Sequence, residues 1–230
     1  MKIINAAAGQ PDSPGERKLI QTLTSQLDDT YTLFRGVLLP RATDTIDAVL
    51  VGPSGVLVIA VYEYEGTYAC EGDEWFHSPD GGQSWQSTTE NPVKQVLYDH
   101  IQLEACLKRE GVREVFFEKA VVFPNARTHV SPRRPAARLL HLKALKRYAH
   151  ELSGQTYLTL AQVDNIIAVL TKTARITATR PRPSSPAPRL PARRTSGTLT
   201  TGLLVLGIVL LCISAVCFAS ALALLLQGQL

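Results

Sequence analysis

One aspartate stands inside a run of residues that otherwise favours the interior of a β-sheet. Asp47 is the third residue of TIDAVLVGP, residues 45–53. A carboxylate in such a strand needs a hydrogen-bond partner or a metal ion, because burying an unpaired charge costs free energy. The alternative for Asp47 is an edge-strand residue that faces water.

Glu16 has a purely structural interpretation. Ser13 precedes Pro14, and Glu16 follows three residues after Ser13, which is the pattern of a helix capping box. Apolar residues at helical spacing then predict a helix within residues 13–30: Leu19, Ile20, Leu23 and Leu27. This pattern gives Glu16 the role of a capping residue.

Strand-like runs follow this first helix. They occupy residues 31–39, 44–51 and 56–66, and the turn at 52–55 predicts that the last two form a hairpin. A second turn at 79–82 separates Trp75 from Trp85. We expect these two side chains to pack in a hairpin, the alternative being that they stack on nucleic-acid bases.

The remaining patterns complete an α/β domain. They predict a helix from Asn91 to about Glu110 with an apolar face that includes Ile101, a buried strand at 116–124, and helices at 141–152 and 159–174. The order of elements favours an α+β sandwich, with a mixed β-sheet flanked by helices. Cys70 and Cys106 form no metal-binding or disulfide pattern, which excludes a zinc module and a disulfide scaffold.

Several of these segments together resemble the nuclease-related domain (NERD) family. They are GERKLIQTL, TDTIDAVLVGPSGVLVIAVYEYEG, Trp75 and NPVKQ, within residues 13–123. The resemblance implies a restriction-endonuclease-like fold of the PD-(D/E)xK group. It also implies phosphodiester hydrolysis with one or two divalent metals, held by carboxylates on adjacent strands beside a lysine.

The chain departs from the family pattern at the positions that would carry this chemistry. The expected acid-x-Lys falls on Ala60-Val61-Tyr62. Ala60 cannot bind a metal, and Tyr62 carries no positive charge at neutral pH. In an unbroken strand Glu63 and Glu65 would point to the opposite face. We expect Tyr62 and Tyr64 to fill the space of the lost metal site.

Three family positions keep a polar residue: Glu16, Asp47 and Gln95. The resemblance implies that the carboxylates of Glu16 and Asp47, from different elements, could hold a weak metal site, since hard cations take oxygen ligands. Both roles of Glu16 therefore stay open, metal ligand and capping residue. Gln95 has an alternative role in beginning its helix or linking it to the sheet. We therefore expect a degenerate active site that needs no cofactor, with Mg²⁺ or Mn²⁺ as the cofactor if any activity remains. Lys94 or Lys119 could replace the missing lysine, and this alternative would keep the chain an active nuclease.

The charge of the chain is unevenly distributed. There are 24 basic and 20 acidic residues, and five of the arginines lie in the proline-rich segment 179–198, which has no acid. Removing those five leaves 19 basic residues against 20 acidic ones, a balance that does not favour strong phosphate binding. One local basic cluster is a candidate nucleic-acid site, the alternative being a solvated surface: Arg127, Arg133, Arg134, Arg138, Lys143, Lys146 and Arg147.

An apolar segment near the C-terminus predicts a transmembrane helix. Residues 203–226 would form a helix of about 36 Å, longer than the hydrocarbon core of about 30 Å. We assign 199–226 to the span and 227–230 to a short tail. The arginines of the juxtamembrane linker 179–198 place residues 1–178 on the cytoplasmic side. Small residues at four-residue spacing predict a homo-oligomer through the span: Ala215, Ala219 and Ala223.

These observations lead to three hypotheses for function. The first is a membrane-anchored, single-pass nuclease-fold module that binds nucleic acid or a protein partner without cutting. The second is an active Mg²⁺- or Mn²⁺-dependent nuclease whose catalytic acid and lysine have moved. The third is a membrane scaffold with no role in nucleic-acid binding.

Overall fold

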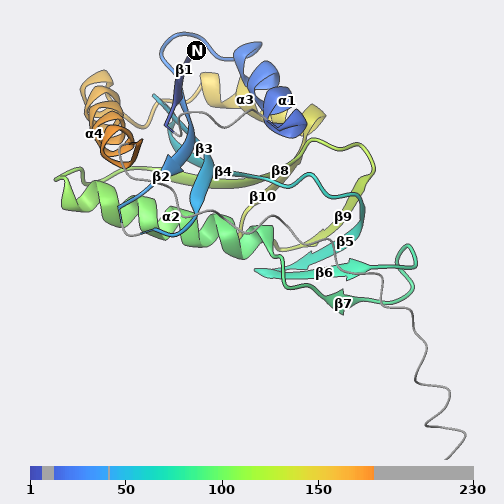
Figure 1. Cartoon of the computed structure of the whole chain (residues 1–230). Helices are drawn as coiled ribbons and strands as arrows, with labels where there is room; N and C mark the ends of the chain where they lie inside the picture. The colour runs from blue at the N-terminus through green and yellow to red at the C-terminus, as the bar shows by residue number, and fades with distance from the viewer. Residues whose placement is uncertain (7–12, 41, 179–230) are drawn as a thin grey trace, which may run out of the picture. The chain divides into compact units, whose positions relative to one another are not determined.

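A computed structural model describes residues 1–6, 13–40 and 42–178 (Figure 1). The predicted linker, transmembrane segment and tail lie outside these residues, and so does the predicted oligomer contact. Within the described residues, no helix combines the length and the apolar composition that crossing a membrane requires.

A six-stranded mixed sheet forms the centre of the domain, in the order β1-β2-β3-β4-β8-β10. The middle strands β2, β3 and β4 run antiparallel, while β8 and β10 are parallel to β4, and β1 is parallel to β2. The mixed sheet predicted from the sequence is therefore confirmed. The strands span Lys2–Asn5 (β1), Thr32–Leu38 (β2), Thr45–Gly52 (β3), Gly55–Val61 (β4), Phe117–Phe123 (β8) and Arg138–His141 (β10).

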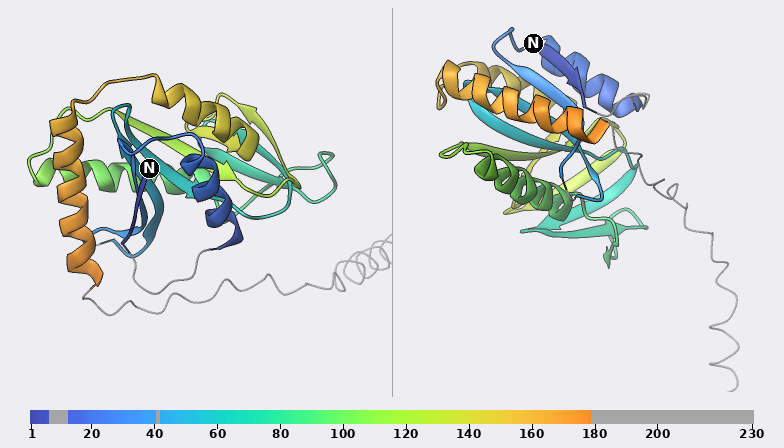
Figure 2. Two further views of the ribbon diagram at one scale, coloured as in Figure 1. Left: turned by 90° about the horizontal axis from the view of Figure 1, so that it is seen from above. Right: turned by 60° about the vertical axis from the view of Figure 1, so that its left-hand side comes forward.

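Helices cover both faces of this sheet (Figure 2). On one face lie α1 (Pro14–Thr24) and α3 (Leu142–Ser153), whose leucines share a buried cluster with alternate residues of the strands. On the other face lie α2 (Pro92–Arg109) and α4 (Leu160–Ala178), which pack on the intervening residues of the same strands. All four helices occur where the sequence predicted them.

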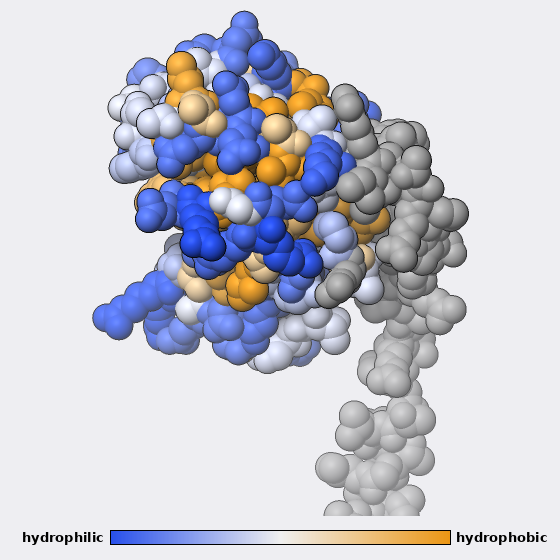
Figure 3. Space-filling view, turned by 90° about the vertical axis from the view of Figure 1, so that its left-hand side faces the viewer, coloured by the Kyte–Doolittle hydropathy of each residue, from blue (hydrophilic) through white to orange (hydrophobic). Residues whose placement is uncertain are grey.

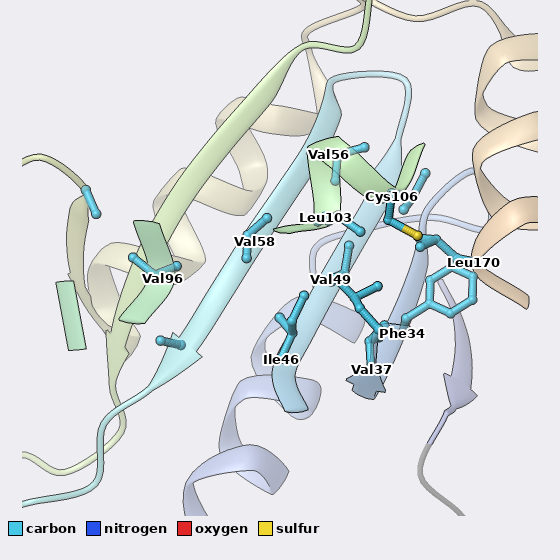
Figure 4. Packing of buried hydrophobic residues seen from close by; sticks show 14 of the residues in the cluster. Phe34, Val37, Ile46, Val49, Val56, Val58, Val96, Leu103, Cys106 and Leu170 are labelled. Atoms are coloured by element: carbon cyan, nitrogen blue, oxygen red, sulfur yellow. The ribbon is translucent and has the colours of Figure 1, made fainter. Parts of the chain in front are cut away.

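The face that carries α2 and α4 holds the larger part of the core. Figure 4 shows Phe34, Val49 and Val58 from the sheet lying against Leu103 of α2 and Leu170 of α4. These side chains are at most 1% exposed. Seen from the side in Figure 3, hydrophilic residues cover most of the molecular surface around the apolar ones.

A second, four-stranded sheet was not predicted as a separate layer. Its order is β7-β6-β5-β9, with strands at Gln86–Ser87 (β7), Glu74–Ser78 (β6), Gly66–Glu71 (β5) and Thr128–Arg133 (β9). The predicted turn at 79–82 joins β6 to β7. Trp75 is 1% exposed and packs in the core, whereas Trp85 is 42% exposed. Hairpin packing is therefore confirmed for Trp75 alone.

The prediction of one strand over residues 56–66 was wrong. The central-sheet strand β4 ends at Val61, and β5 begins at Gly66 in the other sheet. Gly66 has φ +130°, a backbone conformation that other residues rarely adopt. Thr128 donates a hydrogen bond to the carbonyl of Tyr64 and holds the crossing segment in place. The sequence pattern missed this break because the apolar residues continue through it.

Two substitutions on α2, one at a buried and one at an exposed position, test which face of the helix packs on the sheet. Leu103 is fully buried, whereas Ile101, which we had placed on the apolar face, is 58% exposed. We expect Leu103→Ala to lower the free energy of unfolding of the full chain by about 2–5 kcal/mol, through lost contacts and a cavity. Ile101→Ala should change it by less than about 0.5 kcal/mol. Urea unfolding followed by tryptophan fluorescence checks both, and equal losses would contradict the assigned orientation of α2.

Candidate functional site

A pocket opens where the end of β4 meets the beginning of α2. Its volume is about 570 Å³. It brings together four of the five degenerate family positions, Asp47, Ala60, Tyr62 and Gln95, while Glu16 is not among its lining residues. The other lining residues are Val61, Tyr64, Thr89, Glu90, Asn91, Pro92, Lys94 and Tyr98.

Asp47 lies at the point where the pairing of β3 with β4 ends. The last backbone pair is Ala48 with Ile59, and beyond it the Asp47 Oδ2 accepts the N–H of Val61 at 2.8 Å. Because β3 lies inside the sheet, Asp47 is not an edge-strand residue. The pKa of Asp47 is raised to about 6, first by burial and also by the carboxylates of Glu16 and Glu63. The hydrogen bond from Val61 acts in the opposite direction and lowers it.

Asp99 is a second buried acid beside this pocket, and the sequence analysis missed it. It is 5% exposed, and Gln95 Nε2 donates to its Oδ1 at 2.9 Å. Burial raises the pKa of Asp99 to about 7, against the Gln95 hydrogen bond, and the charge of Asp47 adds to the rise. Asp99 lies between Val96 and Leu103 on the apolar face of α2, and this position in the sequence could have indicated that it is buried. The Gln95 side chain thus forms its hydrogen bond within α2.

Glu16 has the capping role. The Ser13 N–H donates to Glu16 Oε2 at 2.8 Å, and the Glu16 N–H donates to Ser13 Oγ at 3.0 Å, which confirms the predicted capping box. Arg35 Nη2 also lies 3.5 Å from Glu16 Oε2. These contacts engage the Glu16 carboxylate at the start of α1.

Glu63 and Glu65 lie beyond the end of β4 and do not line the pocket. Glu63 packs against Gly15, where an added Cβ would lie 2.6 Å from its carboxyl group. Glu65 accepts hydrogen bonds from Asn125 and Arg127. Neither acid therefore replaces the carboxylate missing at Ala60.

Aromatic rings occupy the position where the family would carry a lysine. The Tyr62 side chain is buried, and its ring centroid lies 4.8 Å from that of Tyr64. Edge-to-face contacts of 5.6 to 6.0 Å join Tyr62 to Tyr68, Trp75 and Phe123. Burial raises the pKa of Tyr62 well above its ordinary value, so its hydroxyl stays neutral. Tyr62 and Tyr64 both line the pocket, and the expectation that they fill the space of a lost metal site stays a prediction.

The two candidate replacement lysines differ in position. Lys94 lines the pocket, but its Nζ lies 2.7 Å from Glu74 Oε1 in an exposed ion pair. Lys119 lies on β8 and does not line the pocket. Lys94 is therefore the better placed of the two.

The side chains around Asp47 do not fit the metal chemistry of the family. Among the residues that the structure describes, no group of three His, Cys, Asp or Glu side chains is arranged to hold a metal ion. Ala60 offers no ligand, and Glu16 is engaged by Ser13 and Arg35. The arrangement therefore offers Asp47 as a pocket-lining carboxylate beside an aromatic surface, without a set of metal ligands among the described residues.

The predicted basic cluster is spread over β9 and the residues that flank it, β10 and α3. Three of its arginines form ion pairs, Arg127 with Glu65, Arg133 with Glu71, and Arg138 with Glu118. Arg138 also lies over the ring of Tyr148, 4.8 Å from its centroid. Arg134 has φ +48°, while Lys143, Lys146 and Arg147 are exposed on α3. Nucleic-acid binding by this cluster stays a prediction.

A mixed sheet covered on both faces by helices, with Asp47 and Ala60 on neighbouring strands, agrees with the restriction-endonuclease-like class of fold. Comparison with protein families gives the narrower assignment, because residues 11–124 match the nuclease-related domain. This part of the chain is a nuclease-related domain, and the predicted family is confirmed. No curated protein and no solved structure matches the chain.

The buried acids predict a particular pH dependence of stability. An acid whose folded pKa is raised binds its proton more tightly in the folded state, so stability falls as pH rises from about 4 to about 7. Asp99→Asn removes one of the two titrations. Between about pH 4 and about pH 7 we expect the free energy of unfolding of the Asp99→Asn variant to fall less than that of the unchanged chain, by on the order of 2 kcal/mol.

Urea unfolding of the full chain at several pH values measures this slope. Asp164→Asn is the control, because Asp164 is exposed on α4. Identical slopes for Asp99→Asn and the unchanged chain would show that Asp99 is not a buried acid in solution.

Proposed function

We propose that this chain is a catalytically degenerate nuclease-fold module that binds a protein partner at the cytoplasmic face of a membrane. The observation that carries the proposal is the state of the former catalytic corner. Asp47 accepts a hydrogen bond from the Val61 N–H, and the side chain of Ala60 has no atom that could bind a metal ion. The Tyr62 ring packs among buried aromatic residues. Such a corner has a recognition pocket but lacks the charges that would stabilise a phosphoryl transition state.

A protein partner fits the described surface better than nucleic acid does. The pocket carries the carboxylates of Asp47 and Glu90, which repel phosphate. Arg127, Arg133 and Arg138 each share their charge with an acidic side chain. Net positive charge, on which non-specific nucleic-acid binding depends, is thereby reduced at the predicted cluster.

Membrane attachment is part of the proposal and rests on the sequence. The uncharged segment 203–226 is long enough to cross a bilayer, and the arginines of 179–198 favour the cytoplasmic side for residues 1–178. A module held at a membrane meets its partner at an increased local concentration. A pocket of modest affinity is then sufficient for function.

The catalytic part of this proposal predicts no hydrolysis. The full chain in detergent micelles, with single- and double-stranded DNA and RNA in Mg²⁺ or Mn²⁺, should cleave no faster than its Asp47→Ala variant. Metal-dependent cleavage that disappears in Asp47→Ala would instead establish an active nuclease with a moved lysine. Lys94→Ala and Lys119→Ala would then identify that lysine. Retention of nucleic acid that disappears in an Arg133→Ala/Arg134→Ala variant would make nucleic acid the ligand.

The membrane part predicts the behaviour of the chain on alkaline carbonate extraction. The full chain should remain with the membrane pellet, because the apolar side chains of 203–226 are stable only in the hydrocarbon core. A chain that ends at residue 198 should be recovered in the supernatant. Release of the full chain together with peripheral proteins would contradict the anchor.

A further inference from the structure

The pocket beside Asp47 combines aromatic rings with negative charge. Tyr62, Tyr64 and Tyr98 supply the rings, and Asp47 and Glu90 supply carboxylates. Among the described residues that line the pocket, Lys94 is the only basic one, and its ammonium group lies 2.7 Å from Glu74. The lining therefore attracts a cation.

Two of the three rings are accessible to a ligand. Tyr64 is 45% exposed and Tyr98 is 49% exposed, while Tyr62 lies buried behind Tyr64. Glu90 lines the same pocket as Tyr64, and burial and the Glu90 carboxylate raise the pKa of Tyr64. An exposed ring face next to a carboxylate is an arrangement that binds organic cations, because the ring quadrupole and the charge attract the same ligand.

An anion has no comparable site in this pocket. The beginning of α2 could in principle bind a phosphate through its free N–H groups. Here the side chain of Asn91 already accepts the N–H groups of Val93 and Lys94, each at 3.0 Å. A phosphate would have to displace this cap and would then face Asp47 and Glu90.

We propose that the pocket binds an arginine side chain of the partner protein, with the guanidinium group stacked on the exposed rings of Tyr64 and Tyr98 and paired with the carboxylates of Glu90 and Asp47. This inference rests on the proposed function, since it names the group by which the partner is recognised. It also assigns a ligand to the pocket in which Ala60 and Tyr62 occupy the positions of the family's metal-binding acid and lysine.

Arginine fits this lining better than lysine does. Its guanidinium group is planar, so it can stack on a tyrosine ring while its N–H groups donate to a carboxylate. Charge-assisted hydrogen bonds of this kind are about twice as strong as neutral ones. Lysine offers a compact, strongly hydrated charge, which loses more hydration when it enters an aromatic pocket.

The test uses the full chain in detergent micelles and three short peptides. They are acetyl-Gly-Arg-Gly-amide, the same peptide with citrulline, which has the shape of arginine without its charge, and the same peptide with lysine. Ligand-observed NMR titration measures the dissociation constants. We expect a value on the order of 1 mM for the arginine peptide, and binding at least about tenfold weaker for citrulline.

Two variants place the binding in the pocket. Glu90→Gln should weaken the arginine peptide by about tenfold, and Tyr98→Leu should weaken it by about 2–5-fold. Both residues are exposed, so these changes should leave the fold intact. The matched controls are Glu151→Gln and Tyr157→Leu, which change exposed residues of the same types outside the pocket.

Equal binding of the arginine and citrulline peptides would overturn the inference, as would equal binding of arginine and lysine. Insensitivity to both pocket variants would also overturn it, and so would displacement of the arginine peptide by a short oligonucleotide. These results are separate from the cleavage assay. A chain that neither cleaves nucleic acid nor selects arginine would retain the proposed function and lose only this account of its ligand.

Discussion

The hydrogen bond from the Val61 N–H to the Asp47 carboxylate stands at the point where the architecture of the domain changes. Up to this bond, β3 and β4 pair through their backbones, from Gly52 with Gly55 to Ala48 with Ile59. Beyond it the Tyr62 N–H donates a backbone hydrogen bond to the Val122 carbonyl of the central sheet. It then crosses to the second sheet. The Asp47 side chain thus replaces the backbone pairing of β3 with β4 at the place where the pocket begins.

The loss of the metal-binding pattern has a structural counterpart in the second sheet. Tyr62 contacts Trp75 of β6, whose ring stacks on that of Phe123 in β8. These aromatic residues join the two sheets into one apolar layer. Large aromatic side chains bury much area and prefer tilted or offset contacts. A charged lysine at position 62 would lie against this layer, where its desolvation would be costly. The aromatic packing and the catalytic pattern are therefore alternatives at this position.

Asp47, which is half-buried, and Asp99, which is buried, remain as acids although no set of metal ligands occurs among the described residues. Each has one hydrogen-bond donor, the backbone of Val61 for Asp47 and Gln95 for Asp99. Burial raises the pKa of both, and their mutual repulsion adds to this for Asp99. Acids held in this way lower the stability of the folded state near neutral pH. Perturbed acids beside a pocket are frequent at binding sites, and the arginine proposed as the ligand would relieve their repulsion.

The sequence by itself determined the family, the four helices of the described residues and the hairpin of β3 and β4. The capping box at Ser13, the hairpin turn at 52–55 and the beginning of α2 at Pro92 are local patterns, because each depends on residues within a few positions of one another. Ala60 and Tyr62 were recognised from the family spacing for the same reason. The apolar segment at 203–226 is likewise evident from composition alone.

Only the tertiary structure decided which side chains meet at the pocket. Asp99 and Ile101 lie two positions apart on α2, and the packing of that helix on the sheet buries the acid and exposes the isoleucine. The break after Val61 and the second sheet depend on partners far along the chain, such as Thr128 for Tyr64. Local periodicity carries no information about such partners. It therefore located several residues of the site and could not say which of them share one pocket.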